Sequence, residues 1–258
     1  MTRHDWSGQS VLVTGAGRGL GQAIALDLAA RGANLTIVSR TVANLTTTSN
    51  LIDDLAQGGR VVAVAADVGT ANGAQAAVAL AQRTYGRLDL VINNAGVLAP
   101  VKPLWEADPA DWLGNITANL GSVFLVCRAA LPGMIARKEG AILNISSGAA
   151  VGVRTSWSAY CAAKAGIDHL TRVLAAEVAP YNIQVNAAYP GIVDTPMQAE
   201  IRATPAADFG AENLALFTSF HEEGKLRQPA QVARFIAKVA AASQSGQIFK
   251  IDDFKEED

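Results

Sequence analysis

Cysteine and histidine are scarce in this sequence of 258 residues, and their scarcity argues against two kinds of site. Cys127 and Cys161 are the two cysteines, which fits a reducing compartment better than a disulfide-stabilised secreted fold. We interpret both as small core side chains. The three histidines, His4, His169 and His221, are scattered without the spacing of metal ligands, so we predict no metal site.

The sequence also lacks a strong charge of either sign. Its formal net charge is -2 at pH 7 and it contains no basic run, so nucleic acid and anionic membranes are not expected as partners. The N-terminus lacks the apolar core of a signal peptide, and no uninterrupted apolar stretch reaches membrane-spanning length. We therefore expect a cytoplasmic protein.

Half of the residues are hydrophobic, which is ample for one extended core. Continuously apolar runs such as Val11-Leu12-Val13 alternate with amphipathic stretches, which indicates parallel strands buried on both faces by helices, a doubly wound α/β fold. We predict strands at Ser10–Thr14, Asn34–Ser39, Val61–Ala66, Leu88–Asn93, Ala141–Ser146, Ile183–Ala188 and Gln247–Ile251. We predict helices at Gly19–Ala30, Val42–Ala56, Ala71–Tyr85, Pro109–Arg137, Trp157–Ala179 and Gln231–Ala241.

One long segment, Gly191–Arg227, has no firm periodicity and contains two prolines that break regular structure. Its aromatic residues and Met197 favour a lid with short helices that packs over a bound molecule. The alternative is an excursion that only adds to the core. No linker or composition shift divides the chain, so we predict one domain over residues 1–258 with this lid inside it.

A glycine-rich loop, Thr14-Gly15-Ala16-Gly17-Arg18-Gly19-Leu20-Gly21, lies between the first predicted strand and the first predicted helix. Glycines allow a tight turn and a close approach of the backbone to a pyrophosphate, and the helix N-terminus offers free amides. The loop departs from the G-x-G-x-x-G pattern, because Leu20 stands where that pattern has its last glycine. Its position still predicts a phosphate-binding turn.

Tyr160 and Lys164 stand four residues apart in a predicted helix and therefore lie on the same face. A nearby cation stabilises phenolate, so this spacing predicts a lowered Tyr160 pKa and a phenol that gives and takes protons. Cys161 is adjacent in sequence but does not face Tyr160, because neighbouring helical positions point in different directions.

With these elements in register, the chain resembles the short-chain dehydrogenase/reductase family. The glycine spacing is that family's, and Ser147 lies thirteen residues before Tyr160, at the end of a predicted strand. The resemblance covers nearly the whole chain. It implies a single Rossmann domain with a doubly wound sheet of seven parallel strands, and an oxidoreductase that uses a nicotinamide cofactor.

The resemblance also implies roles for individual residues. Asp67 and Val68 would contact the adenine, while the segments Asn93-Asn94-Ala95-Gly96 and Pro190–Thr195 would approach the cofactor, the latter at its carboxamide. The residues implied to bind the cofactor are Gly15, Gly17, Arg18, Gly19, Leu20, Ser39, Arg40, Asp67, Val68, Asn93, Ala95, Gly96, Tyr160, Lys164, Pro190, Gly191, Ile192 and Thr195.

The choice between NADH and NADPH is made after the second predicted strand, where an acidic residue would repel a 2′-phosphate. This chain has Ser39-Arg40 there, and Arg18 supplies a second cation in the glycine loop. A guanidinium suits a phosphate, so NADPH is the expected cofactor. Either arginine alone is also compatible with a solvated surface charge.

The family's catalytic residues are matched by Ser147, Tyr160, Lys164 and Asn119. By that resemblance, Ser147 donates a hydrogen bond to the substrate carbonyl and Tyr160 delivers a proton to its oxygen. Lys164 holds the ribose hydroxyls and favours phenolate, and Asn119 anchors a water through its backbone carbonyl. Ser146 is the structural neighbour of Ser147.

Within the family, the segment Tyr189–Gln198, together with Trp157, looks like sepiapterin reductase and the related benzil or diketone reductases. Asp252 or Asp253 matches an aspartate that anchors the substrate in that subgroup, unless it is only tail charge. We expect a ketone or vicinal dicarbonyl substrate. The predicted apolar pocket wall, for which core packing is the alternative, comprises Leu98, Trp157, Met197 and Phe217.

Two other functions remain open from the sequence. A 3-oxoacyl-[acyl-carrier-protein] reductase has the same catalytic residues and would need basic residues beside the site, for which Arg128 and Arg172 are candidates. The other is a catalytically idle NADP(H)-sensing protein of the same fold. The family also implies a homodimer or homotetramer through the long helices around Pro109–Arg137 and Trp157–Ala179.

Overall fold

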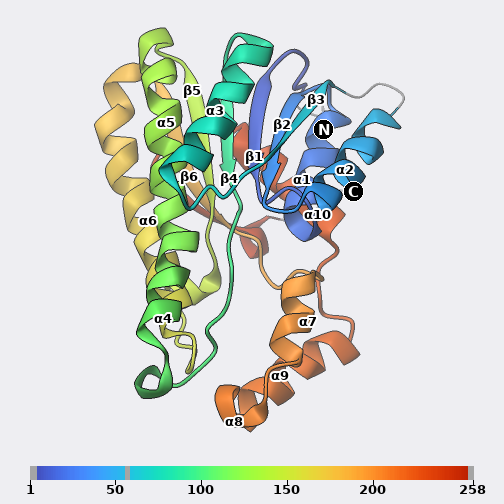
Figure 1. The fold of residues 1–258 in the computed structure, drawn as a ribbon, viewed down its shortest axis with the longest axis vertical. Coiled ribbons are helices and arrows are strands. Elements are labelled where there is room, and N and C mark those ends of the chain that lie inside the picture. The colour runs from blue at the N-terminus through green and yellow to red at the C-terminus, as the bar shows by residue number, and fades with distance from the viewer. Residues whose placement is uncertain (1–4, 56–58, 255–258) are drawn as a thin grey trace.

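The computed structural model describes residues 5–55 and 59–254. Within them, seven parallel strands form one sheet in the order β3-β2-β1-β4-β5-β6-β7 (Figure 1). The strands are β1 (Ser10–Thr14), β2 (Asn34–Ser39), β3 (Val61–Ala65), β4 (Leu90–Asn93), β5 (Gly140–Ile145), β6 (Ile183–Tyr189) and β7 (Ile248–Lys250). This order confirms the predicted doubly wound α/β fold with seven strands.

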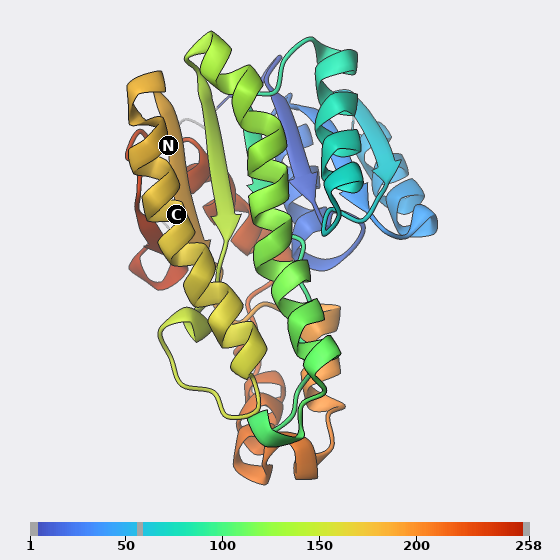
Figure 2. The same cartoon turned by 60° about the vertical axis from the view of Figure 1, so that its left-hand side comes forward.

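Helices cover both faces of the sheet (Figures 1 and 2). One face carries α1 (Gly19–Ala29), α2 (Val42–Asp53) and α10 (Pro229–Ala240), and the other carries α3 (Ala71–Tyr85), α5 (Ser122–Arg137) and α6 (Ser158–Val178). Side chains of a strand alternate between the two layers, so Val11 and Val13 pack with the first set of helices and Leu12 with the second. All three side chains are fully buried, which explains the continuous apolar runs.

The predicted helix Pro109–Arg137 is continuous but not uniform. It consists of α4 (Pro109–Ile116), a π-helical turn (Thr117–Gly121) and α5. Most other predicted boundaries differ from the observed ones by one or two residues, because helix ends depend on caps that periodicity does not reveal. The predicted second helix ends at Asp53, and its expected last residue, Ala56, lies outside the described residues.

The same stretch, Pro109–Arg137, is long and apolar enough to cross a membrane by length and composition alone. The sequence reasoning did not anticipate this, since charged and polar residues interrupt the run. The side chains of Val123, Val126, Cys127 and Met134 on α5 pack in the core against the sheet. This packing is that of a core helix.

The segment between β6 and α10 leaves the sheet and folds into α7 (Pro196–Arg202), α8 (Ala206–Phe209) and α9 (Ala211–Glu222), which lie beyond the end of the sheet (Figure 1). An isolated parallel bridge between Val193 and Arg227 closes its base. Hydrogen bonds from Asp194 N to Arg227 O and from Arg227 N to Ile192 O, both 2.9 Å, hold this base in place. The predicted lid segment is therefore helical and anchored at both ends.

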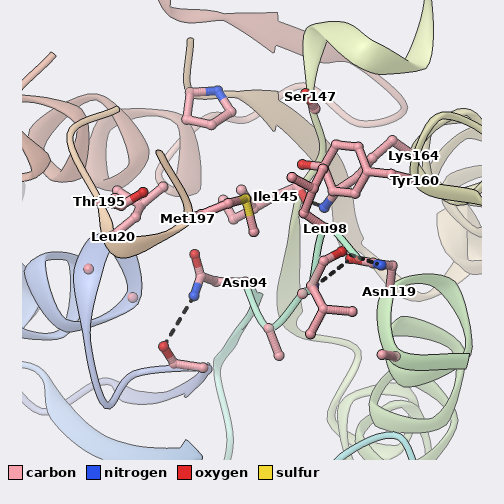
Figure 3. Close-up of a pocket in the computed structure, with 18 of the residues that line it drawn as sticks. Leu20, Asn94, Leu98, Asn119, Ile145, Ser147, Tyr160, Lys164, Thr195 and Met197 are labelled. Atoms are coloured by element: carbon pink, nitrogen blue, oxygen red, sulfur yellow. Dashed lines mark hydrogen bonds between the residues drawn. The ribbon is translucent and has the colours of Figure 1, made fainter. Parts of the chain in front are cut away.

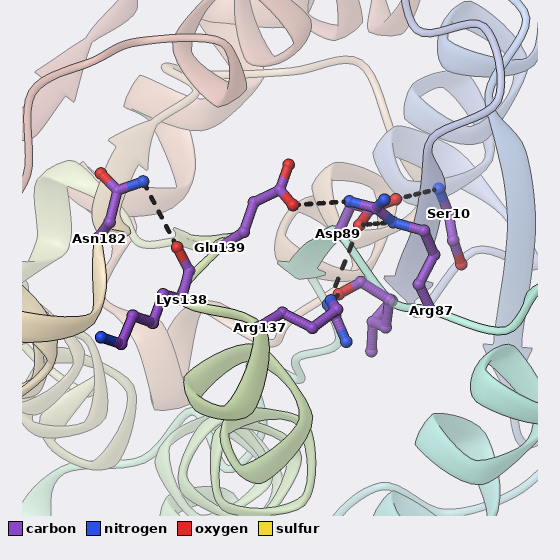
Figure 4. A network of polar contacts seen from close by, with 8 residues as sticks. Ser10, Arg87, Asp89, Arg137, Lys138, Glu139 and Asn182 are labelled. Carbon is purple, nitrogen blue, oxygen red and sulfur yellow. Dashed lines mark hydrogen bonds and ion pairs between the residues drawn. The ribbon is translucent and has the colours of Figure 1, made fainter.

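Asp89 is a buried carboxylate at the start of β4, at the edge of the sheet away from the lid. It accepts hydrogen bonds from Ser10 N at 2.9 Å and from Arg87 Nε at 2.5 Å, and Arg137 Nη2 lies 3.9 Å away (Figure 4). Arg87 also pairs with Glu139 at 3.0 Å. The carboxylate thus joins β1, the β4 segment and α5 through charge-assisted bonds.

We expect Asp89→Ala to lower the free energy of unfolding by about 3 kcal/mol, because it leaves a buried amide and a guanidinium without their acceptor. Urea unfolding at pH 7 measures the change. Glu139→Ala is the matched control: its side chain is 61% exposed, so its loss should cost less than about 1 kcal/mol. Equal losses for the two variants would contradict this account.

Candidate active site

A cleft of about 1180 Å³ lies outside the carboxyl ends of the strands, between the glycine loop and α7 (Figure 3). In a doubly wound sheet the crossovers from β1 and from β4 run to opposite faces, which opens a crevice at that point. The cleft is large enough for a dinucleotide together with a small substrate. The loops that follow β1, β2, β3, β4, β5 and β6 all contribute residues to it.

The glycine loop is built so that side chains are excluded from it. Gly15 has φ 67° and Gly19 has φ 58°, a backbone region that favours glycine. A Cβ on Gly17 would lie 2.8 Å from Ser39 Oγ, and a Cβ on Gly21 would lie 2.3 Å from Gly15 O. Asn94 Nδ2 donates to Thr14 O at 3.0 Å and holds the start of the loop.

The first amides of α1 remain available for a ligand. Arg18 is the N-cap, and no side chain of the described residues caps the helix there. Uncapped amides and the positive end of the helix dipole favour an anion. Together with the side-chain-free loop, they fit the pyrophosphate of a dinucleotide.

The residues assigned to the cofactor, to catalysis and to the apolar pocket wall line this cleft, with one exception. The exception is Asn93, whose side chain is buried between β4 and β5 and donates to Asn144 Oδ1 at 2.9 Å. Asn144 in turn donates to Thr171 Oγ1 at 2.9 Å, so this polar chain ties the centre of the sheet to α6. The assignment of Asn93 to the cofactor is corrected: Asn94, the next residue, faces the cleft.

Ser147, Tyr160 and Lys164 converge on one side of the cleft (Figure 3). Ser147 follows β5 and caps the short turn Gly148–Ala150, with its Oγ accepting from Ala149 N at 3.2 Å. Tyr160 and Lys164 are both buried on α6, and the Lys164 Nζ lies 5.5 Å from the centre of the Tyr160 ring. Lys164 Nζ donates to Ile145 O at 2.7 Å, which fixes the ammonium beside β5.

Ser146 is fully enclosed and its hydroxyl donates to Lys164 O at 3.3 Å, so it supports the helix that carries the pair.

The Tyr160 pKa differs from the direction that the spacing predicts. Burial raises the pKa of Tyr160 to about 12, and a hydrogen bond with Ser147 lowers it in part. Burial also lowers the pKa of Lys164 to about 8, opposed by the carboxylate of Asp168. The expectation of a lowered phenol pKa is wrong for this structure, because the low dielectric disfavours both charged forms. Tyr160 is therefore a protonated phenol near neutral pH.

Asn119 lies in the π-helical turn and is fully buried. Its side chain clamps the backbone of Val97, donating to Val97 O at 2.9 Å and accepting from Val97 N at 3.2 Å. Its Nδ2 also donates to Asn115 Oδ1 at 2.9 Å. The side chain thus positions the loop after β4, and the backbone carbonyl accepts from Ser122 Oγ at 3.2 Å.

The four predicted pocket residues, Leu98, Trp157, Met197 and Phe217, form one apolar cluster with Tyr160. The Trp157 ring stacks on Phe209 with ring centres 5.4 Å apart and meets Tyr160 edge-on at 5.8 Å. The four residues both line the cleft and pack with each other, so the two readings of them, pocket wall and core, apply together.

Charged residues stand around the rim of the cleft. Arg18 pairs with Glu200 on α7 at 3.1 Å, while Arg40 forms no ion pair within the described residues. Asp252 lines the cleft but pairs with Arg227 at 2.5 Å. Asp253 does not line it in the described part of the chain.

Sequence reasoning missed Tyr189 and Phe209, which are buried beside the site. Tyr189 ends β6, and its position at the carboxyl end of a parallel strand was the available signal. Phe209 lies behind Trp157 in the lid, and no local pattern links two residues so distant in sequence.

The geometry defines a dinucleotide-binding oxidoreductase site of the Rossmann type. The family model "short chain dehydrogenase" matches residues 9–206. The 3-oxoacyl-[acyl-carrier-protein] reductase of Synechocystis sp. is 33% identical over 245 residues, which is 95% of this chain and 95% of that protein. The chain belongs to the short-chain dehydrogenase family, and it is an oxidoreductase.

Two further comparisons bear on subgroup and cofactor. A benzil reductase of Bacillus cereus is 36% identical over 168 residues, covering 63% of this chain and 67% of that protein. The crystal structure of an NAD+-bound xylitol dehydrogenase has a TM-score of 0.86 and 25% sequence identity, covering 95% of this chain and 98% of that one. A benzil reductase is thus among the relatives, in line with the resemblance to diketone reductases. The family's cofactor is a nicotinamide dinucleotide.

We expect Gly21→Ala to weaken nicotinamide dinucleotide binding at least about tenfold. The new methyl group would lie 2.3 Å from Gly15 O and 2.4 Å from Asn94 Nδ2, so the loop must move, at a cost of about 1–3 kcal/mol. Cofactor titration followed by fluorescence measures the dissociation constant. Gly114→Ala is the control, because nothing lies within 4 Å of its added Cβ. Unchanged cofactor affinity in Gly21→Ala would contradict the assignment of the glycine loop to cofactor binding.

Proposed function

We propose that the protein is an NADPH-dependent reductase that converts a ketone or dicarbonyl to the alcohol, with Tyr160 as the proton donor. The observation that supports it best is the buried, protonated Tyr160 phenol, which lies with Ser147 and Lys164 in a partly apolar cleft. A reduction needs an acid at the carbonyl oxygen, and a phenol that keeps its proton at neutral pH can serve as that acid.

In this proposal, Ser147, Tyr160 and Lys164 have different roles at the carbonyl oxygen. Ser147 donates a hydrogen bond to it, so that developing negative charge meets a fixed dipole. Tyr160 gives its proton to the same oxygen. The Lys164 charge favours the phenolate that Tyr160 leaves behind. A bound nicotinamide cofactor supplies the hydride for the carbonyl carbon. The apolar wall around Trp157 excludes water from the reacting group.

We propose NADPH because Arg40 directly follows β2 and lines the cleft. The position before it is Ser39 rather than an acidic residue, and Arg40 has no ion-pair partner in the described chain. Arg18 is a weaker candidate than the sequence suggested, because Glu200 pairs with it at 3.1 Å. A 2′-phosphate would have to compete with that carboxylate for Arg18. Arg40 is thus the principal contact that we propose.

The second candidate function, 3-oxoacyl-[acyl-carrier-protein] reduction, is favoured by the 33% identical relative with full-length coverage. Neither of its two candidate basic residues, Arg128 and Arg172, is among the described lining residues of the cleft, although Arg154 and Lys250 are. Arg128 instead lies in a separate surface hollow between α3 and α5. A parallel assay of NADPH oxidation with diketones and 3-oxoacyl thioesters discriminates between the two substrates.

We also propose a cytoplasmic location and self-association as a homodimer or homotetramer. A large apolar side chain is exposed on each of α4, α5 and α6, namely Leu113, Phe124 and Val173. In Figure 2, α5 and α6 lie side by side over one face of the sheet. An exposed apolar helix pair of this kind suits a helix-to-helix contact with a second copy.

We expect Tyr160→Phe to lower kcat/KM for diketone reduction by about 10²- to 10⁴-fold, the usual contribution of a positioned acid, with little change in NADPH affinity. Stopped-flow or steady-state NADPH oxidation measures the rate. Tyr85→Phe is the matched control, because its hydroxyl bonds to Leu35 O at 3.0 Å, outside the cleft. Full activity in Tyr160→Phe would remove the proposed proton transfer, whereas a wild-type protein that oxidises NADPH with no carbonyl would favour the idle cofactor-sensing alternative.

Arg40→Ala should lower the ratio of kcat/KM with NADPH to that with NADH by about 10- to 100-fold, because a charge-assisted bond to the 2′-phosphate is worth about 1.5–3 kcal/mol. The wild-type ratio should exceed one. Arg60→Ala, which removes a guanidinium that lies over the Tyr85 ring instead, should leave the ratio unchanged. A wild-type preference for NADH would rule out the proposed cofactor.

A further inference from the structure

A buried polar pair, Asp168 and Tyr189, lies next to Lys164 and has no part in the proton transfer described above. Asp168 is on α6, one turn beyond Lys164, and is 4% exposed. Tyr189 is the last residue of β6 and is 6% exposed. The Tyr189 hydroxyl donates a short hydrogen bond to Asp168 Oδ2. The pair therefore connects the helix that carries Tyr160 to the strand that leads into Pro190-Gly191.

The other carboxylate oxygen of Asp168 has no partner. Asp168 Oδ1 is buried and accepts no hydrogen bond from the described residues. An unsatisfied buried acceptor on a charged group is costly, so a compensating interaction is expected nearby. Lys164 and Arg172 both lie four residues from Asp168 on α6 and therefore on its face of the helix. Of the two, Lys164 is buried with Asp168, whereas Arg172 is exposed.

The charged and titratable groups around this pair come from α6 and β7. On α6, Lys164 is flanked by Asp168 and Tyr160, and Arg172 acts on Tyr189 from the next turn. From β5, Lys164 meets only the carbonyl of Ile145 among its hydrogen-bond partners in the described chain. From β7, Lys250 stands opposite Tyr189 in the strand register. Asp168 is thus the carboxylate that acts on Lys164.

We propose that Asp168, held in place by the Tyr189 hydroxyl, is a positioning residue that keeps the buried Lys164 side chain charged. Burial of an amine favours its neutral form, and a fixed carboxylate one turn away offsets that penalty. Tyr189 supplies the donor that orients the carboxylate. The catalytic consequence rests on the proposed carbonyl reduction, whereas the coupling of the two charges does not.

The direction of the effect follows from the pKa of Lys164. Burial lowers that pKa to about 8, and Asp168 opposes the decrease. The pKa of Tyr189 is raised, first by burial and then by its bond to Asp168, so Tyr189 stays a neutral donor. Without the carboxylate charge, the Lys164 pKa falls further, and a smaller fraction of Lys164 is charged at pH 7 to 8.

A double-mutant cycle on unfolding, without cofactor, tests the charge coupling directly. The variants are Asp168→Asn, Lys164→Met and the double variant, each unfolded by urea at pH 7 and at pH 10. We expect a stabilising coupling at pH 7 that is lost at pH 10, where Lys164 is neutral in the folded protein. As control, a cycle of Asp89→Asn with Lys164→Met should show no coupling at either pH. Coupling that is absent, or equal at both pH values, overturns the proposal.

The pH profile of diketone reduction supplies the second readout. We expect the alkaline limb of kcat/KM to move to lower pH by about one unit or more in Asp168→Asn. In Tyr189→Phe it should move the same way by less, because the carboxylate remains. Asp89→Asn is the control: it should also be destabilised, but the alkaline limb of its kcat/KM profile should stay at the wild-type pH. A shift that came only from lost stability would appear in this variant too. An unmoved limb in Asp168→Asn contradicts the proposal.

The two experiments fail separately. If the wild-type protein reduces no ketone, the proposed function is wrong, and the unfolding cycle alone decides whether Asp168 holds the charge of Lys164.

Discussion

The parallel arrangement of the sheet is the constraint on which the rest of the structure depends. Because the strands run in one direction, all of their carboxyl ends meet at one edge, and the loops that follow them share one cleft. The glycine loop after β1, Arg40 after β2, Asp67 after β3, Asn94 after β4 and Ser147 after β5 become neighbours for this reason alone. Their separation in sequence has no bearing on their proximity.

Burial then sets the chemistry of the side chains that the sheet brings together. The same loss of solvent that raises the Tyr160 pKa lowers that of Lys164, so both groups move toward their neutral forms. A neutral phenol suits the delivery of a proton, but a neutral amine would not stabilise the phenolate that results. The Asp168 carboxylate and its Tyr189 donor resolve this conflict within the fold, because they place a compensating charge where water cannot reach.

The predicted lid, Gly191–Arg227, likewise contributes both to the packed core and to the cleft. Its residues Phe209 and Phe217 pack on Trp157, and Trp157 in turn packs on the Tyr160 ring. The surface proposed to shape the substrate pocket is therefore also the surface that holds Tyr160, the proposed proton donor. Ion pairs of Lys102 with Asp208 at 2.6 Å and of Arg18 with Glu200 at 3.1 Å attach the lid to the loop after β4 and to the glycine loop. Changes in the lid are expected to affect orientation of Tyr160 as well as substrate choice.

By itself, the sequence determined the doubly wound fold, the glycine loop after β1 and the shared helix face of Tyr160 and Lys164, because periodicity, glycine spacing and helical geometry are local properties. Ser147 was placed beside them only by the resemblance to the family. The sequence did not reveal that Asn93 is a core residue, that Phe209 stacks on Trp157, or that Glu200 forms an ion pair with Arg18. It also gave the wrong direction for the Tyr160 pKa, since a spacing of four residues identifies a neighbouring charge but not the solvent around it. Only the tertiary structure decided these points, because burial and contacts between distant segments exist only after the chain has packed.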